Sequence, residues 1–280
     1  MFFYGKKQSI AGVLFSALET LSRQGQKPPM PILYDWIGLT EQIKQLNTLL
    51  NRRCTELTAL FDKNGYLNCI IKGQGNALMY PDPLLRSSGD IDIWVNGSRD
   101  EIVEFCHSRV VECKESRHHI LFPLWENVKI EVHFVPSFSR VPRFIKRTQQ
   151  YFEQFQREEI DSRGIMPEEY KMFIPSKEMN LVSQMSHMAR HFFHGGIGFR
   201  QVMDYYYLLV YCNLNENECL KESVKSVFYD LGLYKYASAV MWILKVVFGM
   251  DEKYLIMPVD ERRGKLLMDE IMMGGEFWEI

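Results

Sequence analysis

The stretch "KGQGNALMYPDPLLRSSGDIDIWV" spans Lys72 to Val95 and decides the fold. It carries a glycine-spaced turn, then an arginine, and then two aspartates two residues apart within an apolar segment. Isolated carboxylates lose hydration when a strand is buried. The two aspartates therefore require either solvent or a cation beside them.

The end of this stretch, residues 90–95, predicts a β-strand. Its alternation places the two isoleucines and the valine on one face and Asp90, Asp92 and Trp94 on the other. Carboxylates at positions i and i+2 lie roughly 6–7 Å apart at their Cα atoms, so both can reach one divalent ion. Mg²⁺ prefers such oxygen ligands and often shares them with substrate phosphates.

A second alternating segment supplies a third acid. Residues 118–136 predict a hairpin that turns near residues 126–127. In its second arm Val128, Ile130, Val132 and Phe134 share a face, and Lys129, Glu131 and His133 share the opposite one. We therefore expect Glu131 to join the two aspartates as a metal ligand and to act as a general base.

The glycines upstream of the aspartates predict a phosphate-binding loop. Gly73 and Gly75 follow a short apolar strand over 67–71, where a turn can present backbone N–H groups to phosphate oxygens. Lys72 and Arg86 can neutralise phosphate charge, and Ser87 can donate a hydrogen bond. The alternatives are structural: Arg86 paired with Asp82 or Asp90, and Ser87 capping the loop.

The rest of the chain predicts an α+β fold, a small mixed sheet flanked by helices and followed by a helical half. Helices are expected at 8–24, 40–62 and 97–113, the last with a capping box formed by Ser98 and Glu101. Further helices are expected at 177–194, 200–213, 220–231, 234–249 and 261–273, with C-caps at Gly65, Gly195, Gly232 and Gly249. We expect a domain of residues 1–150 and a helical domain of residues 151–280 that closes over the site, with the boundary within 137–176.

Composition excludes several classes of protein. The net charge of −2 gives no overall basic field for long nucleic acid. The six cysteines form no CxxC pair and are expected to be reduced thiols of a cytoplasmic protein. The N-terminal segment is expected to be an amphipathic helix, and no segment approaches the length of a membrane span.

A helical stripe of histidines is a weaker candidate site. His187, His191 and His194 lie at i, i+4 and i+7, and two histidines one turn apart can bind zinc. The H-E-x-x-H motif is absent, so a polar groove lining is favoured. Arg200 is expected either to contact substrate or to pair with Asp204.

"IIKGQGNALMYPDPLLRSSGDIDIWV" resembles the signature of the uncharacterised bacterial nucleotidyltransferase-like family of the polymerase-beta-type nucleotidyltransferase superfamily. "VKIEVHF" and "HMARHFFHGGIGFRQVMDYYYLL" resemble its Glu-x-His strand and its helical half, so the resemblance covers about residues 45–210. It implies the three acids as catalytic metal ligands. The nucleotide-binding residues that it implies are Lys72, Gly73, Gln74, Gly75, Arg86 and Ser87.

This chain departs from the resemblance at two places. The wider superfamily has Gly-Gly or Gly-Ser in the loop, where this chain has "GQGN", which leaves the individual phosphate contacts open. The chain stops at "GGEFWEI", where relatives are expected to continue, so part of the helical half is expected to be missing.

Residues and resemblance together predict an Mg²⁺- or Mn²⁺-dependent enzyme that moves a nucleoside monophosphate from an NTP to an acceptor hydroxyl and releases pyrophosphate. ATP is the default donor, and the acceptor is open among small molecules, peptides, proteins and RNA. The alternatives are a non-catalytic nucleotide-binding regulatory module, a toxin–antitoxin nucleotidyltransferase and a zinc-dependent hydrolase that uses the histidine stripe.

Overall fold

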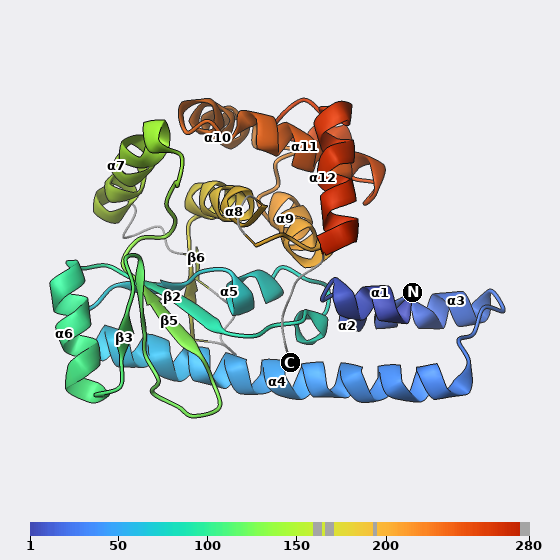
Figure 1. Ribbon diagram of the computed structural model, residues 1–280, viewed down its shortest axis with the longest axis horizontal. Coiled ribbons are helices and arrows are strands. Elements are labelled where there is room, and N and C mark those ends of the chain that lie inside the picture. Colours follow the sequence, from blue (N-terminus) through green and yellow to red (C-terminus); the bar gives the residue numbers. More distant parts are fainter. Residues whose placement is uncertain (159–163, 166–170, 193–194, 275–280) are drawn as a thin grey trace.

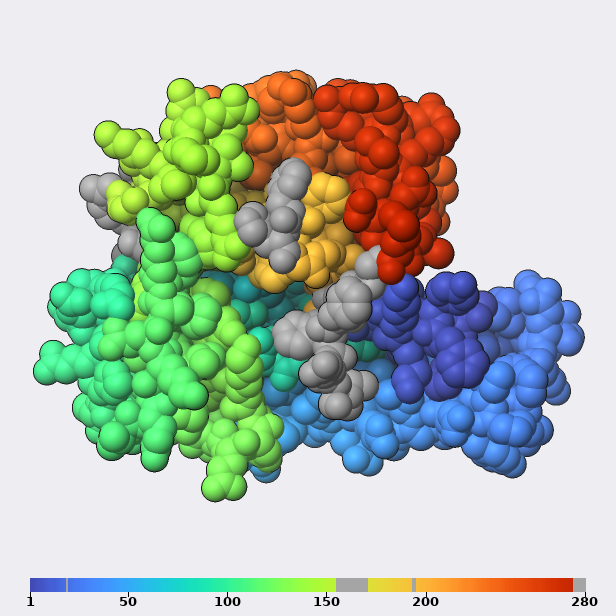
Figure 2. All heavy atoms as spheres, in the orientation of Figure 1, coloured from blue at the N-terminus to red at the C-terminus, as the bar shows by residue number. Residues whose placement is uncertain are grey.

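The protein consists of two halves stacked on one another. The computed structural model describes residues 1–158, 164–165, 171–192 and 195–274. The lower half in Figure 1 holds a small sheet and the long helix beneath it, and the upper half holds helices only. Figure 2 shows the same division in the space-filling view, with the helices of the second half resting on the first. The α+β prediction is confirmed.

The N-terminal region is broken into short helices, so the expected single helix over 8–24 is wrong. The helices are α1 (Phe2–Lys7), α2 (Ala11–Ser16) and α3 (Leu18–Arg23). Ser9 breaks the chain between α1 and α2 with a φ of 54°. After this break α2 docks on the rest of the fold, where Trp36 Nε1 donates a hydrogen bond to the Ala11 carbonyl at 2.7 Å. A Cβ on Gly12 would lie 2.4 Å from the Leu85 carbonyl oxygen, which shows how closely the elements approach.

The long helix α4 (Met30–Lys63) begins ten residues before the expected start at residue 40. Pro31 lies in its first turn, where a missing N–H costs nothing. The helix packs one apolar face under the sheet, through Leu50, Cys54, Leu57 and Phe61. Gly65 follows the helix with a φ of 81°, as expected of a left-handed cap.

The sheet of the lower half is mixed, as predicted. Its strands are β1 (Asn68–Ile70), β2 (Ile91–Val95), β3 (Lys114–Glu115), β4 (His119–Leu121) and β5 (Ile130–His133), in the order β1-β2-β5-β4-β3. β2 and β5 are parallel, and the other neighbours are antiparallel. The hairpin prediction is confirmed by the pairing of β4 with β5 and by a bridge between Trp125 and Val128.

Helix α6 (Arg99–Arg109) connects β2 to β3 and has the predicted capping box. The Ser98 hydroxyl accepts from the Glu101 amide, and the Glu101 carboxylate accepts from the Ser98 amide at 2.9 Å. The helix ends at Arg109 rather than at 113, because the chain turns there to form β3.

The two faces of the sheet have different neighbours. Ile91, Ile93 and Val95 are buried against α4 and α6, on the face that alternation assigns to them. Trp94 lies on the opposite face and packs against Met179 of the upper half. The face that carries the acids therefore points towards the seam between the halves (Figure 1).

The upper half contains one helix that the sequence analysis left unassigned, α7 (Pro142–Glu158). The expected helices are present with shifted ends: α8 (Lys177–Phe192), α9 (Phe199–Tyr211), α10 (Glu218–Asp230), α11 (Tyr234–Val246) and α12 (Glu261–Gly274). Gly232 and Gly249 have positive φ, as expected of caps. After α8 the left-handed residue is Gly196 with a φ of 79°, one residue later than expected.

Smaller elements complete the fold. They are α5 (Gly73–Ala77), the 3₁₀ turns η1 (Pro83–Leu85) and η2 (Glu252–Tyr254), and the paired strands β6 (Gly164–Ile165) and β7 (Phe173–Ile174). The division at residue 150 stays a prediction, and that residue lies inside α7. All six cysteines are free thiols. Within the described ranges, every helix is too short or too polar to cross a membrane.

Candidate active site

The three predicted acids lie on two neighbouring strands. Asp92 on β2 and Glu131 on β5 are register partners in the parallel pair, so their side chains stand next to each other on one face. Asp90 precedes Asp92 by two residues and lines the same cavity. The structure thus brings together the three carboxylates that the sequence analysis singled out.

Cations of the chain lie between these carboxylates. Lys129 Nζ is 2.6 Å from Glu131 Oε1 and 3.5 Å from Asp90 Oδ2. Lys72 Nζ is 3.1 Å from Asp92 Oδ1. The Lys129 ammonium therefore reaches two of the carboxylates at once, whereas the Lys72 ammonium pairs with the third.

The three acids differ in the direction in which their surroundings shift the pKa. Burial, together with the charges of Asp92 and Glu131, raises the pKa of Asp90. Burial alone would also raise the pKa of Asp92, but Lys72 and a hydrogen bond with His133 hold it well below its ordinary value. Burial opposes ionisation of Glu131 as well, yet hydrogen bonds with His133 and Lys129 lower its pKa to about 2. Asp92 and Glu131 are therefore ionised at neutral pH.

The predicted glycine loop is the start of the short helix α5 rather than an open turn. Lys72 and Gly73 both have positive φ, 59° and 39°, which directs the backbone from β1 into the helix. Lys72, Gly73 and Asn76 line the first cavity. This part of the loop thus lines the same cavity as the acids, and its phosphate-binding role stays a prediction.

The other two loop residues are turned into the protein. The Gln74 amide nitrogen donates to Asn51 Oδ1 at 2.6 Å, and the side chain is buried. A Cβ on Gly75 would lie 2.6 Å from the Ile70 carbonyl oxygen, so this glycine lets α5 pack directly on β1. The nucleotide contacts predicted for Gln74 and Gly75 stay predictions.

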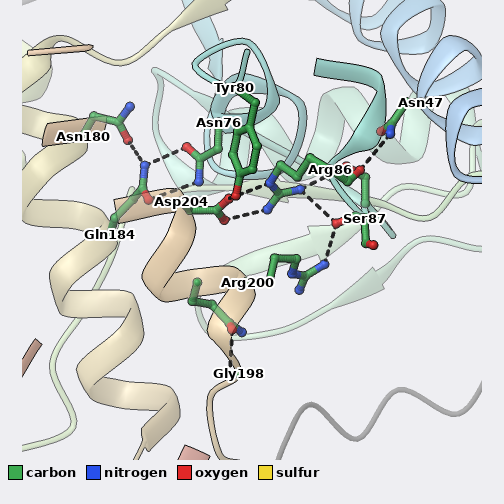
Figure 3. A network of polar contacts seen from close by, with 12 residues as sticks. Asn47, Asn76, Tyr80, Arg86, Ser87, Asn180, Gln184, Gly198, Arg200 and Asp204 are labelled. Atoms are coloured by element: carbon green, nitrogen blue, oxygen red, sulfur yellow. Dashed lines mark hydrogen bonds and ion pairs between the residues drawn. The ribbon is translucent and has the colours of Figure 1, made fainter. Parts of the chain in front are cut away.

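Arg86 joins the two halves through an ion pair with Asp204 of α9. Its Nε and Nη2 atoms each lie 2.7 Å from an oxygen of Asp204, and the Tyr80 hydroxyl donates to the same carboxylate at 2.6 Å (Figure 3). The partner is thus neither Asp82 nor Asp90. Arg200 donates to the Ser87 carbonyl at 3.0 Å, so the backbone of the loop is also tied to α9. Roles of Arg86 and Ser87 towards a nucleotide stay predictions.

An amide network crosses the seam beside this pair. Asn76 of α5 and Gln184 of α8 exchange two hydrogen bonds, of 3.1 and 2.7 Å, and Gln184 also donates to Asn180 (Figure 3). All three side chains are buried. The two bonds between Asn76 and Gln184 hold α8 against α5, and sequence reasoning gave no sign of them because these residues lie 108 positions apart in the chain.

A first cavity of about 310 Å³ opens at the seam. Its wall combines the three acids with Lys72, Gly73 and Asn76 on one side and with His187, His191 and Arg200 from the helices on the other. Arg86 and Asp204 also reach its wall. The volume is at the lower end of the range of small-molecule pockets.

A second cavity of about 1000 Å³ adjoins the first and is strongly basic. The cationic side chains on its wall are Lys72, Arg99, Arg117, Arg140 and Arg190. Glu131 is the one acid that lines it within the described part of the chain. Burial and the charges of Arg117 and Arg190 lower the pKa of His118 to about 4, which reflects the positive potential here.

The two cavities share four residues of their walls, namely Lys72, Glu131, His187 and His191. Glu131 therefore lies where a molecule in one cavity would meet a molecule in the other. Such an arrangement suits a transfer reaction between two substrates.

The histidine stripe on α8 is present in part. The rings of His187 and His191 lie 4.2 Å apart, and both line the seam. His194 lies outside the described residues. Burial and the charges of Arg190 and Lys72 lower the pKa of His191 to about 4, so its imidazole is neutral at physiological pH.

His119 is a candidate that sequence reasoning missed. It is the register partner of His133 across β4 and β5, and its Nδ1 lies 3.7 Å from Glu131 Oε2. His119, Glu131 and His133 form the group in the described chain whose ligand atoms all lie within 4.8 Å of one another.

Comparison with known proteins identifies the family of this chain. Residues 4–249 match the sequence model of a family described as "Uncharacterised nucleotidyltransferase". No match was found among curated proteins. A solved structure, an antigenic nucleotidyltransferase-like protein from Paracoccidioides brasiliensis, is similar with 13% identity and a TM-score of 0.37, over 68% of this chain and 88% of that chain.

Proposed function

Because the chain belongs to this family of uncharacterised nucleotidyltransferases, we propose that it transfers a nucleoside monophosphate from an NTP to an acceptor hydroxyl at the seam between its halves. The observation that carries the proposal is the register of β2 and β5. It sets Asp92 beside Glu131, with Asp90 on the same face, where two cavities meet.

The donor set fits the divalent cation that such a reaction uses. The Lys129 ammonium already contacts both Asp90 and Glu131, and the Lys72 ammonium contacts Asp92, so cations are held beside all three carboxylates. Asp90, Asp92 and Glu131 would hold Mg²⁺ or Mn²⁺, which would neutralise charge on the phosphates in the transition state.

The first cavity is the proposed nucleotide site. Lys72 and the Gly73 backbone face the acids from one side, and Arg200 faces them from the other. Positive groups around a chain of phosphates bind it and stabilise the charge that develops during transfer. ATP is the first donor to test.

The second cavity is the proposed acceptor site. Arg117 and Arg140 are exposed, and no carboxylate lies within ion-pair distance of either in the described part of the chain. The second cavity therefore favours an acceptor that carries negative charge.

In the proposed reaction the acceptor oxygen attacks the α-phosphorus of the NTP. The bond from that phosphorus to the bridging oxygen breaks, and pyrophosphate leaves. Glu131 lines both cavities, so it is the side chain that would accept the hydrogen bond and the proton of the acceptor hydroxyl.

Calorimetry tests the nucleotide site. ATP, GTP, CTP and UTP are titrated into the wild type with and without Mg²⁺, and the titrations are repeated with Asp92→Asn. We expect Mg²⁺-dependent binding that Asp92→Asn weakens by at least about tenfold. Asp100→Asn is the matched control, because the Asp100 side chain is 97% exposed outside the site. Metal-independent binding that survives Asp92→Asn would favour the regulatory module instead.

A second experiment looks for the acceptor. The protein is incubated with α-labelled NTPs and a cell extract, and labelled products are separated by size and by sensitivity to nuclease and protease. Label that appears with the wild type and not with Asp92→Asn identifies the acceptor class. Nucleotide binding with no labelled product at any NTP would remove transfer from the proposal.

A further inference from the structure

Two histidines and a glutamate converge on neighbouring strands at the edge of the second cavity. His119 lies on β4 directly opposite His133 on β5, and Glu131 precedes His133 by two residues on the same face. The two imidazole rings are 5.3 Å apart between centroids. The position of all three side chains is thus set by the pairing of two strands in the sheet.

The separations between Glu131 and the two histidines are those of groups that can share an ion. His119 Nδ1 lies 3.7 Å and His133 Nε2 lies 3.5 Å from the same atom, Glu131 Oε2. His133 Nε2 also lies 2.6 Å from Asp92 Oδ1, so an ion held by this nitrogen would replace that hydrogen bond. A hydrogen bond between such atoms is usually shorter, near 2.7–2.9 Å. Ligands held at about 2.0–2.1 Å from a tetrahedral ion are about 3.3 Å apart, close to the separations seen here.

Neighbouring contacts orient the glutamate for this role. Lys129 Nζ contacts Oε1 of Glu131 at 2.6 Å, which leaves Oε2 directed at the histidines. The His119 side chain is 27% exposed and the His133 side chain 10% exposed, so the group is reachable but largely enclosed. All three residues line the second cavity, where a water molecule or a substrate atom could complete the coordination.

We propose that His119, Glu131 and His133 bind a transition-metal ion, with Zn²⁺ as the best match to two imidazoles and a carboxylate. Imidazole ligands favour Zn²⁺ and the other late divalent metals over Mg²⁺, which prefers oxygen. Three protein ligands and one open position are typical of zinc sites that take part in chemistry. The site lies on the His119 side of the acid cluster, shares Glu131 with it and adjoins Asp92 through His133.

The other histidine cluster is the weaker candidate. His187 and His191 are one turn apart on α8, but they do not belong to a group of three such ligands within reach of one another in the described ranges. A zinc ion on the protein is therefore assigned to the sheet.

Metal titration of the untagged protein tests the proposal without nucleotide. The chelator-treated protein is titrated with Zn²⁺ against a chromogenic chelator, and with Co²⁺ by visible absorption, which is strong for four-coordinate sites. We expect one Zn²⁺ per chain with a Kd below about 1 µM, and bands typical of tetrahedral Co²⁺.

Variants locate the ion. We expect His119→Ala and His133→Ala each to weaken Zn²⁺ binding by at least about tenfold, and His187→Ala to have no effect. His118→Ala is the matched control, because His118 is adjacent in sequence but stacks on Phe138. Circular dichroism checks that each variant is folded.

Absence of stoichiometric Zn²⁺ binding in the wild type would overturn the proposal, as would equal weakening by His118→Ala and His119→Ala. Because no nucleotide is present, either outcome leaves the proposed transfer reaction standing. Conversely, Zn²⁺ binding with no nucleotide binding would support this site and count against the transferase.

Discussion

The buried ion pair between Arg86 and Asp204 yields the most quantitative prediction. Arg86 belongs to the loop before β2, and Asp204 lies 118 residues later on α9, so the pair holds the two halves together. Each residue is only 4% exposed. Three short bonds converge on the Asp204 carboxylate, two from Arg86 at 2.7 Å and one from Tyr80 at 2.6 Å.

Removal of one partner should be costly because the other charge stays buried. Breaking a buried ion pair in this way costs about 3–5 kcal/mol. We therefore expect Asp204→Asn, which keeps an oxygen for Tyr80, to lower the free energy of unfolding by about 3–5 kcal/mol, and Arg86→Met to have a similar effect. The double variant buries no charge, so its loss should be smaller than the sum of the single losses by at least about 2 kcal/mol.

Guanidinium unfolding at pH 7, followed by circular dichroism and by fluorescence, measures these losses. The pH dependence provides a second check. Arg86 holds the pKa of Asp204 below its ordinary value of 3.8 despite burial. The stabilisation is therefore present above that value and is lost as pH falls through the folded pKa. A loss below about 1 kcal/mol in either single variant, or additive losses in the double variant, would refute the reasoning.

Three further predictions concern the loop and the two cavities. Gly75→Ala should lower the free energy of unfolding by about 1–3 kcal/mol, because the new Cβ would meet the Ile70 carbonyl oxygen. Gly89 has open space around it, so Gly89→Ala is the control and should change the free energy of unfolding in urea by less than about 0.5 kcal/mol. Glu131, whose pKa is lowered to about 2 from 4.5, stabilises the fold above pH 4.5 and loses that effect as pH falls towards 2, so Glu131→Gln should flatten the acid limb of the stability profile. Arg140→Glu should raise the KM for an anionic acceptor at least about tenfold with kcat nearly unchanged, and equal kinetics would remove Arg140 from the acceptor site.

The strands at the centre of the fold could be predicted from the sequence, because the alternation of side chains between two faces is a property of each short segment alone. Alternation within 90–95 and 128–134 assigned each side chain to a face, and the acids of the two strands had to meet once those strands became neighbours. Helix α7 was missed although Phe144, Thr148 and Phe152 recur at helical spacing, because its surface is so polar.

Register explains why His119 was missed. A turn at 126–127 with regular pairing would set His133 opposite Ile120 and leave His119 on the other face. In the structure Trp125 pairs with Val128 in that register, but His119 pairs with His133, one residue out of step. A shift of one residue exchanges the faces of a strand, so turn position alone could not place this histidine.

Lys72 combines a strained backbone with a charge on the acids. Its φ of 59° and ψ of −149° form a conformation that residues with a Cβ rarely adopt, at a cost of order 1–3 kcal/mol. The same conformation places its ammonium 3.1 Å from Asp92, with both side chains largely buried. A substitution at this position can therefore change stability in two opposite ways: loss of the ion pair destabilises the fold, and relief of the backbone strain stabilises it.

Two variants separate these effects. Lys72→Met removes the charge and keeps the strain, whereas Lys72→Gly removes both, because glycine adopts positive φ freely. We therefore expect Lys72→Gly to be more stable than Lys72→Met by about 1–2 kcal/mol in urea unfolding, while both lose nucleotide affinity to the same extent. A glycine variant no more stable than the methionine variant would show that the backbone at Lys72 is relaxed. Unequal nucleotide affinities would show that the backbone conformation, and not the charge alone, contributes to the phosphate site.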